Sequence, residues 1–302
     1  MSPDRIGEVR TVVDGRQLTL SSLDKVLYPE TGFTKGEMLD YYTRVAPSML
    51  PHLRDRPLTM RRFPDGVDGT SFYEKHRPAH APLWVRHVAV PTGADGAVEY
   101  SVICDLPALV WAANLATIEF HVPLWRVGRR RNLPGRPDHL VFDLDPGDGA
   151  TIVDCCTVAR LVADELDARG HTGVPKTSGS KGVQVYAPLG GRRTWDTAHE
   201  EARGIALALE EEHPDLVVSN MRKELRQGKV LIDWSQNHPA KTTVAAYSMR
   251  ARPEPSVSTP VTWDEVGQCA ATGDPAVLRF GPGDVLARIE EMGDLFAALA
   301  AH

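Results

Sequence analysis

The chain has 302 residues, of which 42% are hydrophobic and 25% charged, and its formal net charge is −6. This length and composition are typical of a globular protein with one large domain or two modest ones that share a cleft. No apolar run approaches the roughly 18 residues of a membrane-spanning helix, and the first ten residues are polar, unlike a signal peptide. We therefore expect a cytoplasmic protein with no membrane partner.

The negative net charge argues against a protein that coats nucleic acid, but the distribution of charge weakens that objection. Acidic residues concentrate in segments expected to be helical, at 200–212 and 284–294. Basic residues cluster elsewhere, at 61–62, 75–77, 126–131 and 222–229. An acidic protein with one basic face is expected to bind DNA with modest, salt-sensitive affinity.

The cysteines predict neither a metal knuckle nor a disulfide framework. None of Cys104, Cys155, Cys156 and Cys269 belongs to a C-x-x-C pair, and two of them are adjacent. Buried free thiols are the expected state.

Hydrophobic spacing, caps and turn residues predict mixed secondary structure along the chain. The first half is predicted to contain a helix at 35–53 capped by Thr34, a strand at 56–62, a hairpin of 83–90 and 98–103 around a turn at 92–96, a helix at 106–118 and a strand at 119–122. The second half is predicted to contain a strand at 139–145, a helix at 152–169, two strands within 175–188, a helix at 195–212, a strand at 229–234 and a helix at about 284–300.

Strands and helices without a sustained βαβ rhythm favour an α+β fold, with a mostly antiparallel mixed sheet flanked by helices. We expect a single domain over 1–302. Residues of about 1–105 should form an N-terminal accessory layer on a catalytic core of about 106–302, because the candidate chemical groups lie mainly between 120 and 250.

Two carboxylates end the strand predicted at 139–145. Positions two apart on a strand share one face, so Val141, Asp143 and Asp145 should lie together. Neighbouring carboxylates repel each other unless a cation lies between them, and such oxygen ligands suit Mg²⁺ or Mn²⁺. The alternative is an ordinary strand end, since Asp before Pro-Gly is common in turns.

Asp233 ends another apolar strand, where an unpaired carboxylate is costly to bury. A third carboxylate near Asp143 and Asp145 would complete a two-metal site, in which paired cations assist attack and departure of phosphate oxygens. The alternative is a strand-end Asp paired with an arginine, and Arg226 is close enough in sequence to be that partner.

The segment 177–182, Thr-Ser-Gly-Ser-Lys-Gly, is not a Walker A loop. Its glycines nevertheless let backbone N–H groups approach phosphate oxygens, while Ser178 can donate a hydrogen bond and Lys181 supplies charge. A surface hairpin turn with an exposed lysine is the alternative.

Other side chains are weaker candidates. His121 could meet a sugar or phosphate, although a histidine in a strand is commonly structural. Phe72 and Tyr73 could stack on a base, or simply be half-buried. Lys25 and Lys35 resemble surface lysines by pattern alone.

Taken together, the motifs resemble the polymerase domain of bacterial ligase D, within the archaeo-eukaryotic primase superfamily. The resemblance covers nearly the whole chain. It rests on DKVLYP at 24–29, FYEK at 72–75, HVPLW at 121–125, FDLDPG at 142–147, TSGSKG at 177–182, DWSQN at 233–237 and KTT at 241–243.

The resemblance implies a role for each candidate. Two metal ions, Mn²⁺ or Mg²⁺, would be bound by the catalytic residues Asp143, Asp145 and Asp233. The incoming NTP or dNTP would be held by Arg61, Ser178, Lys181, Gln184, Arg226, Gln236 and Arg250, with His121 near its sugar. A 5′-phosphate across a DNA gap or break would be held by Lys25 and Lys35, and the template base by Phe72 and Tyr73.

Two departures from the family pattern matter. Gln184 stands where the family loop has a histidine, and a glutamine can donate a hydrogen bond but cannot carry charge. The chain also ends at His302 without ligase or nuclease domains, so we expect a stand-alone enzyme or an excised domain, with strand sealing supplied by another protein.

The sequence therefore predicts a DNA-directed, primer-extending nucleotidyltransferase. It would fill short gaps or ends during non-homologous end joining, associated with the nucleoid, with Ku and a separate DNA ligase as expected partners. The alternatives are a catalytically weak module that binds or bridges DNA ends, and a primase that starts strands without a primer.

Overall fold

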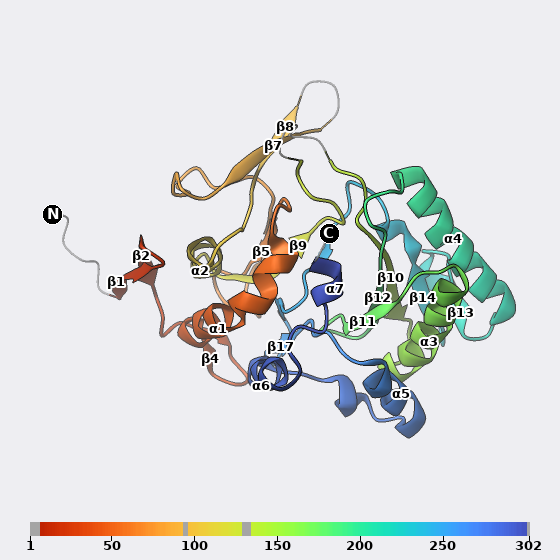
Figure 1. The fold of residues 1–302 in the computed structure, drawn as a ribbon. Coiled ribbons are helices and arrows are strands. Elements are labelled where there is room, and N and C mark those ends of the chain that lie inside the picture. Colours follow the sequence, from red (N-terminus) through yellow and green to blue (C-terminus); the bar gives the residue numbers. More distant parts are fainter. Residues whose placement is uncertain (1–6, 93–95, 129–133, 301–302) are drawn as a thin grey trace.

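The computed structural model of the protein describes residues 7–92, 96–128 and 134–300, and its fold is α+β, as predicted. Two sheets lie near the centre with helices around them (Figure 1). One sheet has five strands and the other has four, and four further two-stranded ribbons surround them. Apart from one strand pair, the pairing in the two larger sheets is antiparallel.

The five-stranded sheet carries the acidic residues. Its order is β11 (Val174–Thr177), β12 (Val183–Pro188), β10 (His139–Pro146), β14 (Val230–Asp233) and β13 (Val217–Val218). Helices α3 (Ile152–Ala168) and α4 (Trp195–Glu212) pack on one face, where they meet Leu140, Phe142 and Leu144. Val141 belongs to a different apolar cluster. Asp143 and Asp145, which alternate with these leucine and phenylalanine residues, therefore lie on the face away from α3.

The four-stranded sheet carries basic and aromatic residues. Its order is β15 (Thr243–Val244), β9 (Thr117–Val122), β5 (Thr59–Arg62) and β6 (Phe72–Glu74). Helices α1 (Lys35–Leu53) and α2 (Leu106–Asn114) share an apolar core with Ile118 and Phe120 of β9. The N-terminal segment thus contributes two strands to the same sheet as β9 and β15.

Smaller elements complete the fold. The two-stranded ribbons are β1 (Glu8–Val13) with β2 (Arg16–Ser21), β3 (Val26–Tyr28) with β4 (Phe33–Thr34), β7 (His87–Pro91) with β8 (Ala97–Ser101), and β16 (Met249–Arg250) with β17 (Ser256–Val257). The remaining helices are α5 (Trp263–Thr272), α6 (Pro282–Met292), α7 (Ala297–Ala300) and three 3₁₀ turns, at Lys223–Leu225, Trp234–Gln236 and Pro275–Leu278.

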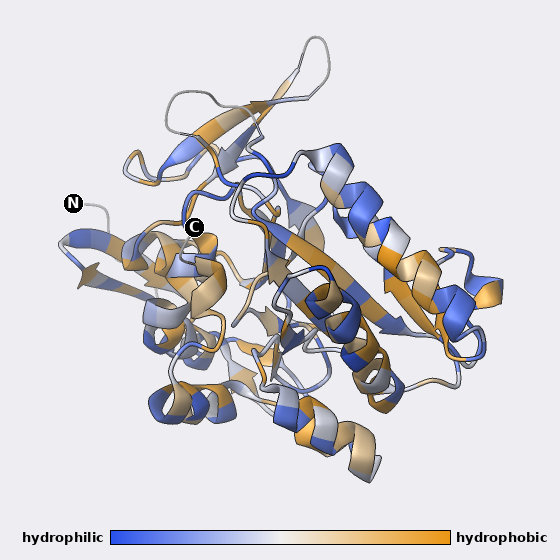
Figure 2. Ribbon diagram, turned by 45° about the vertical axis from the view of Figure 1, so that its right-hand side comes forward, coloured by the Kyte–Doolittle hydropathy of each residue, from blue (hydrophilic) through white to orange (hydrophobic). Residues whose placement is uncertain are grey.

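Local chemistry explains where the helices begin. The hydroxyl of Thr34 accepts from the Glu37 backbone N–H at 3.2 Å, and the Glu37 carboxylate accepts from the Thr34 N–H at 2.7 Å. This reciprocal capping box satisfies two backbone donors that the first turn leaves free. The helices at the right of Figure 2 mix hydrophobic and hydrophilic residues, as expected of helices with one buried side.

Several predicted boundaries are wrong. The helix predicted at 106–118 ends at Asn114, because Ala116 adopts a left-handed conformation (φ 58°) and β9 begins at Thr117. The helix predicted at about 284–300 is divided into α6 and α7 at Gly293 (φ 71°). The strand predicted at 56–62 begins only at Thr59, and α5 was not predicted.

Other predictions are confirmed. The helices at 35–53 and 195–212 lie where expected, and the helix predicted at 152–169 ends one residue early. The predicted hairpin is present, but its strands are His87–Pro91 and Ala97–Ser101 rather than 83–90 and 98–103, and its turn residues 93–95 fall outside the described residues. All four cysteines are free thiols, three of them buried. No helix in the described part of the chain is long and apolar enough to cross a membrane.

Candidate active site

Strand pairing brings the three predicted metal-binding carboxylates to one end of the five-stranded sheet. Asp143 of β10 lies directly opposite Asp233 of β14, and Asp145 lies opposite Leu231 of the same strand. On the other side of β10, Asp143 lies opposite Gln184 of β12. Residues far apart in sequence are thereby juxtaposed by backbone hydrogen bonding alone.

Neutral donors orient these carboxylates. Gln184 Nε2 donates to Asp143 Oδ1 at 2.9 Å. The backbone N–H and the hydroxyl of Ser235 donate to Asp233 Oδ1 at 3.0 and 2.6 Å, and Gln236 Nε2 donates to Asp233 Oδ2 at 2.8 Å. Gln184 and Gln236, predicted to bind nucleotide, therefore contact acidic residues here.

Arg226 does not pair with Asp233, so that alternative explanation of the carboxylate is wrong. The Arg226 side chain donates to the backbone carbonyl of Met221, and its charge acts on Asp145. Of the basic cluster predicted at 126–131, residues 129–131 lie outside the described part of the chain.

The acidic cluster carries more negative charge than its surroundings neutralise. Burial and the neighbouring Asp145 carboxylate raise the pKa of Asp143 to about 7. Burial and Asp233 also raise the pKa of Asp145, although Arg226 and Arg250 oppose that rise. Hard oxygen donors with uncompensated negative charge fit Mg²⁺ or Mn²⁺.

Among the described residues, no three acidic, histidine or cysteine side chains already form a closed set of metal ligands. Cation binding at Asp143, Asp145 and Asp233 therefore requires side-chain rearrangement. The present hydrogen bonds of Asp143 and Asp233 come from flexible glutamine and serine side chains as well as the backbone, so such rearrangement breaks no ion pair between charged residues.

The loop between β11 and β12 is built to present its serine hydroxyl. Ser178 Oγ accepts hydrogen bonds from the backbone N–H groups of Ser180, at 3.2 Å, and Gly182, at 3.1 Å. Both lone pairs are therefore engaged, and the hydroxyl proton is left to donate to a ligand. Lys181 at the loop tip is exposed and makes no hydrogen bond or ion pair with any other described residue.

Two glycines of this loop are sterically required. Gly179 has φ +68°, and a Cβ there would lie 2.7 Å from Arg250 Cγ and from the backbone of 257–258. A Cβ at Gly182 would lie 2.0 Å from the Leu144 carbonyl oxygen. Close approach of the loop to β10 and to Arg250 thus depends on glycine.

The four-stranded sheet and the β16–β17 ribbon contribute further predicted nucleotide-binding side chains. Arg61 of β5, His121 of β9 and Arg250 of β16 all contact the carboxylate of Glu119, a residue that the sequence reasoning did not select. Arg250 also donates to the backbone carbonyl of Ser178, so it links β9 to the Gly/Ser loop. Arg250 therefore connects the Glu119 group to the loop that follows β11.

Another missed residue is Asn237, which is 1% exposed. Its side chain accepts from the Val141 N–H at 2.9 Å and donates to the Val141 carbonyl at 2.7 Å. This bond pair ties the turn after Asp233 to β10. An asparagine in a polar turn gives no sequence signal of such a partner.

The aromatic pair on β6 is open to solvent. Phe72 is 43% exposed and Tyr73 57% exposed. Tyr73 packs edge-on against the His121 ring, with ring centroids 5.6 Å apart. Exposed rings beside Arg61 and Arg62 are suited to base stacking, so this remains a prediction.

Lys25 and Lys35 lie near each other, but they differ in environment. Lys25 forms an exposed ion pair with Asp65 at 2.9 Å. Lys35 is 5% exposed, and its Nζ donates to the Ser21 carbonyl at 2.6 Å. Burial, aided by the Lys25 and Arg62 charges, lowers the pKa of Lys35 to about 8. Lys35 is therefore not the solvated surface lysine that the alternative required.

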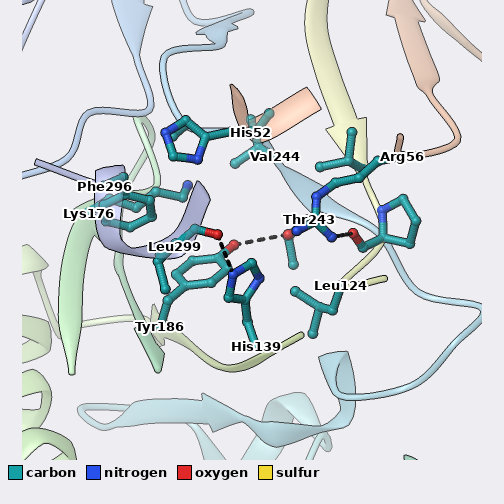
Figure 3. A pocket seen from close by; sticks show the side chains of 14 residues that line it. His52, Arg56, Leu124, His139, Lys176, Tyr186, Thr243, Val244, Phe296 and Leu299 are labelled. Atoms are coloured by element: carbon teal, nitrogen blue, oxygen red, sulfur yellow. Dashed lines mark hydrogen bonds between the residues drawn. The ribbon is translucent and has the colours of Figure 1, made fainter. Parts of the chain in front are cut away.

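A nucleotide cannot occupy the small cavity between the two sheets. That cavity has a volume of about 40 Å³ and is lined by residues of both sheets, including Lys176, Tyr186 and Thr243 (Figure 3). The Tyr186 hydroxyl donates to Thr243 Oγ1 at 2.9 Å and so joins β12 to β15. A groove of about 830 Å³ has the size of a small-molecule site and includes Gly179 and Lys181 of the Gly/Ser loop, but Asp143, Asp145 and Asp233 do not line it.

Carboxylates on paired strands, a Gly/Ser loop beside them and a basic, aromatic second sheet define a polymerase domain of the primase type. The sequence profile described as "LigD, primase-polymerase domain" matches residues 34–296. The chain belongs to this family.

Sequence similarity to individual proteins supports that assignment. The multifunctional non-homologous end joining protein LigD of Mycolicibacterium smegmatis is 42% identical over 288 residues, which cover 94% of this chain and 36% of that protein. The bifunctional LigD of Bacillus subtilis is 32% identical, over 92% of this chain and 43% of that protein. This chain thus spans well under half the length of these relatives.

A solved structure is similar throughout the fold. The polymerase domain of Mycobacterium tuberculosis ligase D, in complex with DNA, has a TM-score of 0.87 and 42% identity. The comparison covers 94% of this chain and 98% of that one.

The raised pKa of Asp143 predicts a stability effect. Ionising Asp143 is easier in the unfolded chain, so the free energy of unfolding should fall as pH rises from about 4 to about 7. At pH 7.5 without divalent cations, Asp143→Asn should raise the unfolding temperature by about 2–4 °C, because the amide keeps an acceptor for Gln184 without the charge. Thermal unfolding measured from pH 4 to pH 8 checks this.

Saturating Mn²⁺ provides the control for that measurement. It should stabilise the wild-type protein more than Asp143→Asn, since the variant loses a charged ligand. A lower unfolding temperature for the variant in metal-free buffer at pH 7.5 would contradict the account of the acidic cluster.

Proposed function

We propose that the protein extends a primer strand on DNA by adding nucleotides, and that it fills short gaps or ends during double-strand break repair. The single observation that carries the proposal is the register that places Asp143 opposite Asp233, with Asp145 beside them on β10 and the Ser178 loop beside the same strand. The relatives named above are end-joining proteins, and the solved domain was found with DNA, which supports this assignment.

In this proposal the primer 3′-hydroxyl attacks the α-phosphate of a bound nucleotide. Divalent cations held by Asp143, Asp145 and Asp233 would activate that hydroxyl and neutralise the leaving pyrophosphate. The Ser178 hydroxyl, Lys181 and the guanidinium groups of Arg61 and Arg250 bind the triphosphate. They orient it by charge-assisted hydrogen bonds.

DNA would lie along the solvent-exposed side of these residues. Phe72 and Tyr73 support the template base by stacking, and His121, against the Tyr73 ring, faces the nucleotide sugar. Lys25 and Lys35 take the 5′-phosphate on the far side of a gap. Ku and a separate ligase would complete the repair.

The departure at Gln184 does not favour an inactive end-bridging module. Its amide donates to Asp143, so it takes part in arranging a candidate metal ligand. The decisive experiment is incorporation of labelled NTPs and dNTPs on gapped DNA, with Mn²⁺ or with Mg²⁺. Extension of the primer supports the proposal, whereas DNA binding without incorporation supports the bridging module.

Removal of any one acidic ligand should abolish extension. Asp143→Ala, Asp145→Ala and Asp233→Ala should each leave DNA affinity within about two-fold of wild type, because the carboxylates serve cations rather than the duplex. Extension rate and DNA affinity are measured on the same gapped substrate. Residual extension above about a tenth of the wild-type rate in any variant would contradict the assigned role.

Substitution of Gln184 tests whether this residue does the work of the histidine that the family has at the same position. Gln184→His should keep or raise the extension rate, because an imidazole N–H can still donate to Asp143 or to a phosphate. Gln184→Leu, which cannot donate, should lower kcat by at least about ten-fold. A clear loss in the histidine variant would show that this position is arranged differently from the family loop.

The 5′-phosphate prediction is tested by affinity for gapped DNA with and without that phosphate. Wild-type protein should prefer the phosphorylated DNA by about 1–3 kcal/mol, the range for charge-assisted hydrogen bonds. Lys25→Ala combined with Lys35→Ala should remove the preference. Arg169→Ala, which removes an exposed charge at the end of α3, should keep it.

The same preference should depend on pH. The pKa of Lys35 is about 8, so its ammonium form predominates below that pH and the preference should be full there. As pH rises above 8, binding must take up a proton and the preference should decline. Equal affinity of wild-type protein for both DNAs at pH 7 would remove the gap-recognition role.

A further inference from the structure

One buried carboxylate contacts Arg61, His121 and Arg250, the three basic side chains from β5, β9 and β16 that we propose to bind the nucleotide. Glu119 Oε1 accepts from Arg61 Nη1 at 3.2 Å and lies 3.3 Å from Arg250 Nε. Glu119 Oε2 lies 2.9 Å from His121 Nε2. The Ala251 backbone N–H donates to Oε1 at 3.1 Å, which fixes the carboxylate to the loop that follows β16.

We infer that Glu119 is a positioning residue that holds Arg61, His121 and Arg250 as one nucleotide-binding unit. The inference rests on the proposed function, and it assigns to Glu119 a task that neither the motifs nor the strand pattern indicated. The three held residues come from β5, β9 and β16, so no local element fixes their relative positions.

The Glu119 side chain is less exposed to solvent than the three side chains it contacts. The Glu119 side chain is 1% exposed and cannot itself reach a substrate. The side chains of Arg61, Arg250 and His121 are 30%, 18% and 11% exposed, so each is partly open to solvent. Glu119 therefore acts through its partners.

The charge balance of the cluster suits a polyanionic ligand. Burial tends to raise the pKa of Glu119, but the hydrogen bond with His121 and the Arg250 charge hold it well below its usual range. Burial lowers the pKa of His121, which leaves its ring neutral at pH 7. Two guanidinium groups against one carboxylate leave a net positive charge, while the carboxylate prevents the arginines from repelling each other.

Contacts outside the cluster connect it to the rest of the site. Arg250 also donates to the carbonyl of Ser178, the residue that presents the phosphate-loop hydroxyl. Arg61 lies over the Tyr73 ring, 5.4 Å from its centroid, and that ring packs against His121. A displacement of Glu119 would therefore misplace groups assigned to the triphosphate, the sugar and the template base together.

The chain offers a matched control for this arrangement. Asp138, just before β10, is 7% exposed and contacts Arg56, Arg126 and His139. It too is one buried carboxylate with two arginines and one histidine. Its partners Arg56 and His139 line the small cavity between the sheets, and Arg126 and His139 bond to the C-terminal residues, so none of them contacts the predicted nucleotide-binding side chains.

The experiment compares Glu119→Gln with Asp138→Asn in the full chain. Both variants lose a buried charge, so both should show lower unfolding temperatures. Only Glu119→Gln should lose nucleotide affinity, by at least about ten-fold in calorimetry with an NTP and Mn²⁺, and change the ratio of ribonucleotide to deoxyribonucleotide incorporation. Asp138→Asn should keep both values within about two-fold.

A double variant tests whether Glu119 acts through Arg61. If it does, Glu119→Gln combined with Arg61→Ala should be much less defective than the product of the two single defects. If the loss of nucleotide affinity in the double variant equals the product of the two single losses, Glu119 and Arg61 act independently. Should Glu119→Gln fail to fold, Glu119→Asp, which keeps the charge on a shorter side chain, is expected to fold and to show a smaller loss of the same kind.

The outcomes separate this inference from the proposed function. Wild-type affinity and sugar ratio in Glu119→Gln, or equal losses in Asp138→Asn, would overturn the positioning role while leaving the polymerase intact. Failure of wild-type protein to extend primers, with NTP binding still lost only in Glu119→Gln, would instead reject the proposed function and keep the positioning role.

Discussion

The candidate site depends on the backbone hydrogen bonding that fixes the register between β10 and its two neighbours. Pairing with β14 sets Asp143 against Asp233, and pairing with β12 sets Asp143 against Gln184. A shift by one residue would turn the carboxylates toward α3 and α4 and bury Phe142 and Leu144 on the wrong side. The apolar contacts of those two residues with the helices therefore fix where the negative charge is concentrated.

Concentrated negative charge costs stability in the metal-free protein, and the surrounding structure offsets it only in part. Hydrogen bonds from Gln184, Ser235 and Gln236 satisfy individual oxygens of Asp143 and Asp233. The charges of Arg226 and Arg250 favour the ionised form of Asp145. The four-stranded sheet and β16 place Arg61, His121 and Arg250 around the carboxylate of Glu119. We call Asp143, Asp145 and Asp233 the acidic wall, and Arg61, His121 and Arg250 the basic wall. An acidic and a basic wall together suit a ligand that brings both cations and phosphates.

Much of the acidic wall could be predicted from the sequence. The two-residue spacing of Asp143 and Asp145 and the single carboxylate that ends the apolar strand at Asp233 each have a direct meaning on a strand. The capped helix after Thr34 was predictable for a similar reason, since its signals lie within four residues. Resemblance to a known family supplied roles that spacing alone could not.

The basic wall was less accessible because it depends on contacts between distant segments. Glu119 contacts Arg61 because β5 pairs with β9. It contacts Arg250 because β16, more than 120 residues further along the chain, packs beside β9. Burial of Lys35 beneath Ser21 likewise depends on packing of the first ribbon. The break between α6 and α7 was missed because a glycine within an amphipathic pattern does not by itself end a helix.

The central claim is that the two walls bind one metal-nucleotide complex. The most direct measurement is a crystal structure of the protein with a non-hydrolysable NTP and Mn²⁺, in which the manganese positions are located by anomalous scattering. The account predicts manganese at Asp143, Asp145 and Asp233, with the triphosphate in contact with Ser178, Arg61 and Arg250. Manganese elsewhere, or a triphosphate bound away from both walls, would contradict it.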